Sequence, residues 1–242
     1  MKSCLLCKKF GKTSGHPTTA CVMFHGASGN GGRIAQSKVP AEYRYTLVTD
    51  LQFNQKMFVA YVDSFKKMFQ PIVSTKDRIK SLYLWSEATG TGKTTTASAL
   101  LNEYHIVHVL LSWKEGRKPN EYPTFFVDVN ELQELFNRFN RQGIPQDVRE
   151  EASREYYRRL EIAKKADLVA FDDIGLRNAT EAFRGDLHTI VNHRTVQQLP
   201  SIYTSNHPIQ SMSEVYDQRL YDRMRDLTVQ VEFTGESLRG MR

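Results

Sequence analysis

Apolar residues recur along this chain in two patterns, short continuous runs and longer helical stripes. The runs cover residues 81–85, 124–129, 168–172, 200–205 and 229–233, and each has the length of a buried β-strand. After the first run, apolar side chains recur at helical spacing from Ala97 to about Trp113, and further helices are predicted over residues 130–140, 181–198 and 211–226. Residues 148–165 are predicted as a mixed-charge helix, because opposite charges recur there at i+4 spacing. Strands that alternate with helices predict an α/β fold, and 242 residues suffice for one such domain with a small appendage.

The stretch before the first run, residues 34–80, carries a dense stripe of aromatic and methionine side chains. Their spacing predicts a helix that packs on the core and ends before Pro71. The stripe consists of Phe53, Met57, Phe58, Tyr61, Val62, Phe65, Met68 and Phe69.

The segment Ser81–Thr96 joins the first run to the following helix through a glycine-containing turn that ends in Lys93-Thr94. This order of strand, loop and helix is typical of a phosphate-binding loop, whose backbone N–H groups surround the phosphates of a nucleotide. We expect Lys93 to contact the β- and γ-phosphates and the Thr94 hydroxyl to hold Mg²⁺. Glu87 replaces the first glycine of the consensus at the start of the loop, away from the phosphates, so binding is expected to survive. The predicted nucleotide contacts are Thr89, Gly90, Thr91, Gly92, Lys93, Thr94 and Thr95.

The run at residues 168–172 ends in a pair of acids, Asp172 and Asp173. Downstream of a phosphate loop, a carboxylate at the end of a strand can bind a Mg²⁺ water, while its neighbour orients or deprotonates the attacking water. We therefore expect Asp172 to serve magnesium and Asp173 to serve ATP hydrolysis. Many ATPases have Glu at the second position, and the shorter Asp side chain suggests slow turnover.

Three further polar residues follow in the last third of the chain. Asn206 stands at the end of the run at 200–205, where its amide can hydrogen-bond the γ-phosphate or the attacking water. Arg219 and Arg223 lie four residues apart on one helical face. They either serve their own helix or reach the ATP of a neighbouring subunit as an arginine finger.

The first 25 residues contain Cys4-x2-Cys7 and Cys21, a spacing typical of a zinc site. His16 or His25 could complete a tetrahedral set, and the similarity of the two cysteine turns favours His16, which lies between them. A segment this short cannot form a core, so zinc would hold it together. The alternative is a tail with three unrelated thiols. Residues 26–32, GASGNGG, predict a flexible linker.

The formal net charge of +6 is concentrated at the start of the chain. Residues 1–41 hold six of the 33 basic residues and no acid, so the remaining 27 basic residues balance the 27 acidic ones. Such a segment favours nucleic acid or an acidic protein surface as partner, and the alternative is a solvated tail. The chain shows no export signal and no apolar stretch that could span a membrane, which predicts a cytoplasmic, reduced protein.

The motifs ATGTGKT, FDDIG, LPSIYTSN and RLYDRMR, in this order, resemble the DnaC/DnaI-type helicase loaders of the AAA+ superfamily. The related IstB transposition helpers share much of the pattern. The resemblance covers roughly residues 34–242 and implies a parallel αβα P-loop ATPase domain, without a full C-terminal lid, that self-associates with ATP at subunit junctions. It implies that Lys93 and Thr94 are the Walker A pair, Asp172 and Asp173 the Walker B pair and Asn206 sensor 1. Arg223 then matches the arginine finger, with Arg219 as its supporting neighbour.

Together these observations predict three segments: a zinc-binding basic segment with its linker (residues 1–33), a linker helix region (34–80) and the ATPase domain (81–242). The resemblance implies an ATP-dependent loader that binds a hexameric replicative helicase through the zinc segment and delivers it onto single-stranded DNA. ATP binding would promote assembly and hydrolysis would release it. The alternatives are an IstB-like helper that binds duplex DNA and recruits a transposase, a P-loop kinase for a small metabolite, and a zinc-dependent DNA-binding adaptor that binds nucleotide without hydrolysing it.

Overall fold

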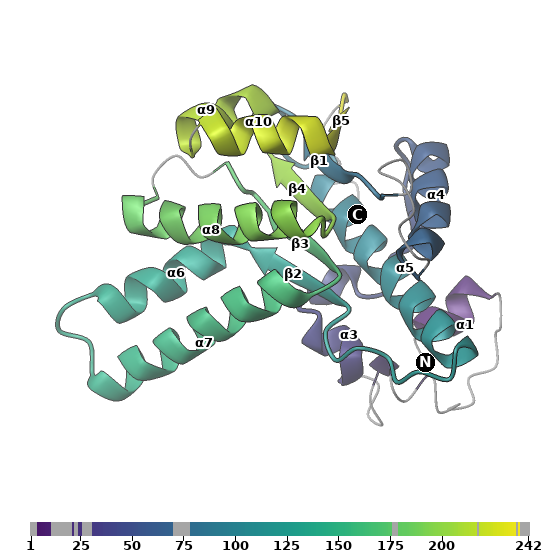
Figure 1. Ribbon diagram of the computed structural model, residues 1–242, viewed down its shortest axis with the longest axis horizontal. Helices are drawn as coiled ribbons and strands as arrows, with labels where there is room; N and C mark the ends of the chain where they lie inside the picture. Colours follow the sequence, from purple (N-terminus) through teal and green to yellow (C-terminus); the bar gives the residue numbers. More distant parts are fainter. Residues whose placement is uncertain are drawn as a thin grey trace. The chain divides into compact units, whose positions relative to one another are not determined.

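The structure is a computed structural model that describes residues 4–10, 21, 24–25, 31–69, 78–175, 179–216, 218–235 and 237 (Figure 1). The chain forms two compact units, one of Met1–Ile79 and Thr94–Phe126, the other of Lys80–Lys93 and Val127–Arg242. Among the helices of the described residues, none has the length and apolar character needed to cross a membrane.

The apolar runs form a five-stranded sheet with the strand order β2-β3-β4-β1-β5. Strand β1 pairs in parallel with β4 and β5, and β3 pairs in parallel with β4, which confirms the predicted α/β fold. Because parallel strands end at the same edge of a sheet, residues that follow β1, β3 and β4 are brought to one edge. The strands are β1 (Ser81–Trp85), β2 (Thr124–Asp128), β3 (Leu168–Asp172), β4 (Ser201–Ser205) and β5 (Thr228–Glu232).

The second unit surrounds its strands with helices close to the predicted ranges, and α6 and α7 run side by side as a helical hairpin (Figure 1). The segment predicted as one helix at 211–226 instead forms two, α9 and α10. The helices are α6 (Val129–Asn140), α7 (Gln146–Lys165), α8 (Glu181–Gln197), the 3-10 turn η5 (Ile209–Ser211), α9 (Met212–Val215) and α10 (Gln218–Leu227).

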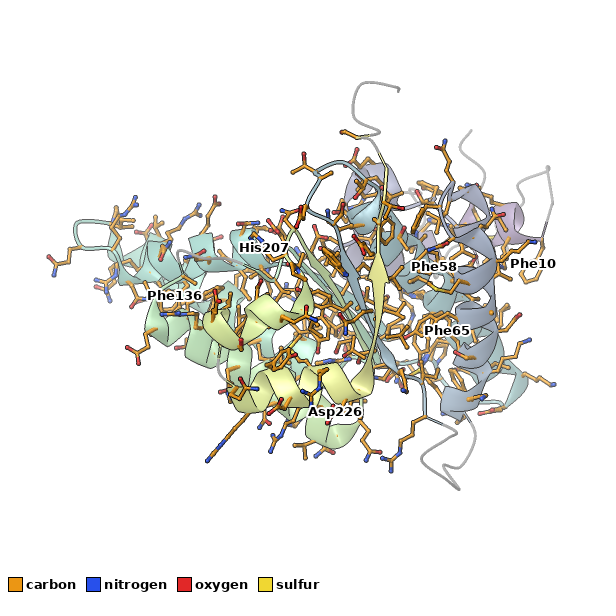
Figure 2. All side chains as sticks on the ribbon, turned by 90° about the horizontal axis from the view of Figure 1, so that it is seen from above. Phe10, Phe58, Phe65, Phe136, His207 and Asp226 are labelled. Atoms are coloured by element: carbon orange, nitrogen blue, oxygen red, sulfur yellow. The ribbon has the colours of Figure 1, made fainter. Side chains whose placement is uncertain are left out.

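A cluster of aromatic rings joins the first three of these helices. Phe136 of α6 has its ring centroid 5.5 Å from that of Tyr156 in α7 and 5.6 Å from that of Phe183 in α8. Figure 2 labels Phe136 among the side chains of the hairpin. Both Tyr156 and Phe183 are fully buried, so these tilted contacts contribute to the stability of the hairpin against α8.

In the first unit, the aromatic stripe packs into the core only in part, and the single helix predicted for it ends at Ser64 and continues as a 3-10 helix. Phe58, Val62 and Phe65 are buried, whereas Met57 of the same stripe is 36% exposed (Figure 2 labels Phe58 and Phe65). The ring of Phe65 meets that of Tyr104 edge to face at 5.2 Å. The helical elements of this unit are α1 (Leu5–Lys9), α3 (Gly32–Gln36), η1 (Ala41–Tyr43), η2 (Val48–Asp50), α4 (Gln55–Ser64), η3 (Phe65–Phe69) and α5 (Lys93–Lys114), which begins at the division between the units.

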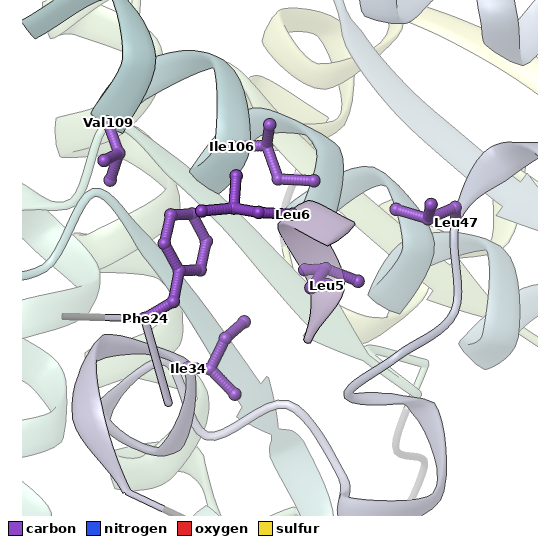
Figure 3. Packing of buried hydrophobic residues seen from close by; sticks show 7 residues of the cluster. All are labelled: Leu5, Leu6, Phe24, Ile34, Leu47, Ile106 and Val109. Atoms are coloured by element: carbon purple, nitrogen blue, oxygen red, sulfur yellow. The ribbon is translucent and has the colours of Figure 1, made fainter. Parts of the chain in front are cut away.

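The described part of the N-terminal segment contributes to an apolar cluster together with α5. Figure 3 shows its seven buried side chains: Leu5, Leu6, Phe24, Ile34, Leu47, Ile106 and Val109. Two lysines of α1 reinforce this packing, because Lys9 Nζ lies 2.8 Å from the carboxylate of Glu103, whose side chain is fully buried, and Lys8 pairs with Asp50. Part of the basic charge at the start of the chain is therefore neutralised by acids that follow much later in the sequence.

Candidate nucleotide and metal sites

The predicted phosphate loop lies between the end of β1 and the start of α5. Gly90 has φ 76° and Gly92 φ 94°, values that favour glycine because a Cβ would strain the backbone there. The side chain of Lys93 is only 9% exposed, and its Nζ donates to the carbonyl oxygens of Ala88 at 3.0 Å and of Ser86 at 3.4 Å. The ammonium group therefore lies inside the loop, where a phosphate group of a nucleotide would meet it. Glu87 is exposed.

The two acids follow β3 at the same edge of the sheet. Asp172 is the last residue of β3, and its Oδ1 accepts a hydrogen bond of 2.7 Å from the hydroxyl of Thr204. Asp173 has φ 60°, a left-handed conformation that is uncommon for a residue with a side chain. The amide of Asn206 donates to Asp173 Oδ1 at 3.3 Å, so the structure brings together two residues that the sequence predicted separately.

Two residues that the sequence analysis missed contact the acid pair. Asn130 of α6 donates to Asp173 Oδ2 at 3.3 Å. The helix predicted over residues 130–140 begins one residue earlier, at Val129, and Asp128 caps it by accepting from Glu131 N at 3.0 Å. Thr204 was counted only as part of an apolar run, although a hydroxyl in a strand that is buried throughout signals an internal partner.

A close backbone approach links the FDDIG and TSN motifs. A Cβ at Gly175 would lie 2.8 Å from Ser205 Oγ, closer than real Cβ contacts allow. The segment after the acid pair therefore packs directly against the end of β4, and glycine is the residue that permits this contact.

Arg219 and Arg223 are both exposed on α10. The next residue, Met224, is 2% exposed, so α10 buries one face and turns its arginines to the other. The guanidinium of Arg223 donates to the side-chain oxygen of Asn192 in α8.

In the first unit, Cys4, Cys7 and Cys21 form a cluster in which all three Sγ atoms lie within 4.8 Å of one another. Cys4 and Cys21 Sγ are 3.2 Å apart, and burial raises the pKa of the Cys4 thiol to about 12. Two sulfur ligands of a tetrahedral zinc ion lie about 3.8 Å apart, so this donor set fits such an ion. It is the one potential metal cluster found in the described part of the chain.

Of the two histidines considered as the fourth zinc ligand, only His25 belongs to the described residues. His25 is 4% exposed, stacks on Tyr45 with ring centroids 5.3 Å apart, and accepts a 3.0 Å hydrogen bond at Nε2 from the backbone N–H of Leu5. That nitrogen therefore already orients the start of α1. His16 lies outside the described residues.

Two other histidines, on α5, serve the interior of the first unit. His105 Nδ1 lies 3.2 Å from Thr124 Oγ1, and His108 Nε2 accepts from the backbone N–H of Asn120 at 3.0 Å. Burial, with smaller contributions from the charges of His108, Arg33 and His25, lowers the pKa of His105 to about 3. His105 is therefore a neutral core residue at physiological pH.

Comparison with known proteins gives a sequence relative and several structural ones. No family model matches the chain. It is 26% identical over 174 residues to the replicative helicase loader DnaI of Bacillus subtilis (strain 168), an alignment that covers 66% of this chain and 48% of that protein. The chain thus spans about half the length of the curated relative it matches.

Among solved structures, a crystal structure of DnaI is similar with a TM-score of 0.56 and 22% identity, covering 83% of this chain and 94% of that one. The crystal structure of the DnaC helicase loader gives a TM-score of 0.52 and 14% identity, with 81% and 100% covered.

The sheet order, the parallel pairing and the loop that follows β1 give this chain the AAA+ type of parallel α/β fold, which it shares with the solved DnaI structure. Within this class, the chain resembles the DnaC/DnaI-type helicase loaders, as its motifs predicted.

Proposed function

We propose that this chain is an ATP-dependent helicase loader that binds a hexameric replicative helicase and delivers it onto single-stranded DNA during the initiation of replication. The observation that carries the proposal is the contact between Asp173 and Asn206. It lies at the edge of the sheet where the loop of Lys93 begins, in a chain that resembles DnaI. These are the groups that a P-loop ATPase needs at its γ-phosphate.

Each residue of the site has a role that follows from its chemistry. Lys93 binds the β- and γ-phosphates together with the backbone of residues 89–95, and Asp172 and the Thr94 hydroxyl hold Mg²⁺. Bound Mg²⁺ neutralises charge on the phosphates. Asp173 orients the attacking water and accepts its proton, while Asn206 hydrogen-bonds that water or the γ-phosphate.

Arg223, with Arg219 beside it on the exposed face of α10, reaches the ATP of a neighbouring subunit. ATP binding then promotes self-association, and hydrolysis reverses it. Mixing two inactive variants tests this: Arg223→Ala lacks the finger and Asp173→Asn lacks the acid. If the finger acts across the subunit junction, the mixture regains part of the ATPase activity; if each variant stays as inactive in the mixture as alone, Arg223 does not act in trans.

In the N-terminal segment, the three thiols and a fourth ligand, predicted as His16, hold Zn²⁺. Bound there, the ion would link Cys21 to Cys4 and Cys7, which flank the buried Leu5 and Leu6, and would hold α1 in place. Phe10, which follows α1 and is 56% exposed, is available for contact with the helicase.

Light scattering on the protein mixed with a hexameric replicative helicase, with and without ATP and Mg²⁺, tests the proposal. Deleting residues 1–33 would remove Leu5 and Leu6 from the core, so point variants are preferable. We expect a stable complex with the unchanged chain, an ATP response that is lost in Lys93→Ala, and weaker binding in Phe10→Ser. Tyr157→Ser is the matched control, because Tyr157 is 54% exposed on α7.

The same light-scattering measurement, repeated with duplex DNA in place of the helicase, separates the loader from the transposition helper. ATP-dependent oligomers on duplex DNA, without a helicase complex, would refute the loader function and favour the transposition helper.

A further inference from the structure

Thr204 is a buried hydroxyl residue in contact with both acids of the candidate ATP site. Its side chain is 2% exposed in β4, and the β3–β4 register, in which Phe171 pairs with Tyr203, places it opposite Asp172. Its Oγ1 lies 2.7 Å from Asp172 Oδ1 and 2.8 Å from the backbone nitrogen of Asp173.

The direction of these two hydrogen bonds is determined by their chemistry. The Asp173 N–H can only donate, so Thr204 Oγ1 accepts from it. The single hydroxyl hydrogen is then directed to the ionised carboxylate of Asp172, which can only accept. One hydroxyl group thus restrains both the orientation of the Asp172 carboxylate and the position of the peptide N–H of Asp173.

The backbone at this point has a conformation that needs such support. Asp173 has φ 60°, and non-glycine residues held in sparsely populated conformations are retained where the surroundings determine them. The backbone of Thr204 also takes part, because its carbonyl oxygen accepts from Ile174 N at 2.9 Å. Three hydrogen bonds from one residue therefore define the turn that aims Asp173 at its asparagine partners.

The geometry points to Thr204 as a positioning residue of the ATPase reaction: its hydroxyl orients Asp172 toward the Mg²⁺ site and holds the turn that presents Asp173. This inference rests on the proposed function, since it concerns the same site. Partners behind a metal-binding group commonly change metal affinity or activity by about 10- to 100-fold when they are removed.

Two substitutions of nearly equal size separate positioning from packing. Thr204→Val keeps the shape and loses the hydroxyl, whereas Thr204→Ser keeps the hydroxyl and loses the methyl group. Thr189→Val is the control, because Thr189 Oγ1 donates to Gly185 O on the exposed face of α8. For each protein, Mg²⁺ is titrated against the binding of a fluorescent, non-hydrolysable ATP analogue, and ATP turnover and the unfolding temperature are measured in parallel.

We expect Thr204→Val to raise the half-saturating Mg²⁺ concentration and to lower turnover, each by about tenfold or more, with analogue affinity at saturating Mg²⁺ nearly unchanged. Thr204→Ser should stay within about threefold of the unchanged protein, because the rescuing group is the hydroxyl. The inference is overturned if Thr204→Val titrates like the unchanged protein, or if Thr204→Ser loses as much as Thr204→Val.

The outcomes also distinguish this inference from the proposed function. An unchanged protein that binds no analogue refutes the nucleotide site and this inference together. An unchanged protein that binds the analogue without hydrolysing ATP refutes the ATPase reaction, and the Mg²⁺ titration still decides the role of Thr204 at the metal site.

Discussion

Arg194 is a fully buried arginine of α8, and we predict that replacing it by methionine strongly destabilises the second unit. A guanidinium group has five N–H donors, and all five are used at donor–acceptor distances between 2.7 and 3.3 Å. The acceptors are the carbonyl oxygens of Ala163, Ala166, Asp167 and Pro200 and the hydroxyl of Ser201. Arg194 thereby joins the end of α7 to the residues before β3 and at the start of β4, at the edge of the sheet opposite the acid pair.

The magnitude follows from the groups that would lose their partner. Each buried acceptor left without a hydrogen bond costs about 1–3 kcal/mol. Part of this total is offset, because the surrounding structure relaxes and the guanidinium charge no longer has to be removed from water. Burial lowers the pKa of Arg194 to about 10, so the group is still protonated at neutral pH. We expect a loss of about 4 kcal/mol for Arg194→Met, at the upper end of single substitutions. Arg194→Lys, which keeps the charge with fewer donors, should lose an intermediate amount.

Urea denaturation and calorimetry at pH 7 measure this loss. For a chain of this size, about 4 kcal/mol corresponds to a decrease in Tm of about 10 °C. Arg158→Met is the matched control, since Arg158 pairs with Glu155 at 2.7 Å on the solvated side of α7 and should contribute about 0.5 kcal/mol or less. The reasoning is refuted if the two methionine variants unfold within about 1 kcal/mol of each other.

Three further predictions concern the acid pair, a buried histidine and a glycine. Asp173→Asn should lower ATP turnover by about 100-fold or more and leave the affinity for the ATP analogue nearly unchanged; equal turnover would exclude Asp173 as the base. Because the pKa of His105 falls from 6.5 to about 3 on folding, only the unfolded chain gains this proton as the pH drops below about 6.5, and stability decreases. Between pH 7 and pH 5 the unchanged protein should lose about 2 kcal/mol more than His105→Gln in urea denaturation, and parallel pH curves would contradict this. Gly175→Ala should cost about 1–3 kcal/mol because its Cβ would meet Ser205, whereas Gly185→Ala, with open space around it, should not destabilise; equal effects in calorimetry would show that the close approach is not limiting.

Much of the fold could be predicted from the sequence because its signals are local. The predicted strands at 81–85 and 168–172 are found as Ser81–Trp85 and Leu168–Asp172, and the helix predicted over 181–198 as Glu181–Gln197. An apolar run or a helical spacing shows which side chains of a segment are buried. This can be recognised without knowing which other segment covers them. The helix predicted over 211–226 is interrupted between α9 and α10, a break that the apolar spacing did not indicate.

The main residues of the candidate site could also be proposed from their local sequence context. Asp172, Asp173 and Asn206 each stand at or just after the end of a strand, so their sequence context alone indicates one edge of a parallel sheet. Their supporting contacts were not predictable. Asn130 and Thr204 reach the acids from α6 and β4, and that contact depends on which strands are neighbours and in which register they pair.

The basic charge at the start of the chain is a second case in which the sequence gives the residues and the tertiary structure gives their partners. The sequence alone locates the excess of basic residues in the first 41 positions. Only the tertiary structure places Lys9 against Glu103, 94 residues further on, and Lys8 against Asp50. The sequence by itself thus indicated most of the elements, a candidate phosphate loop and the position of the acid pair, because those depend on neighbours along the chain. The tertiary structure decided which hydroxyl, amide and carboxylate groups meet, because such contacts depend on packing between segments that are distant in sequence.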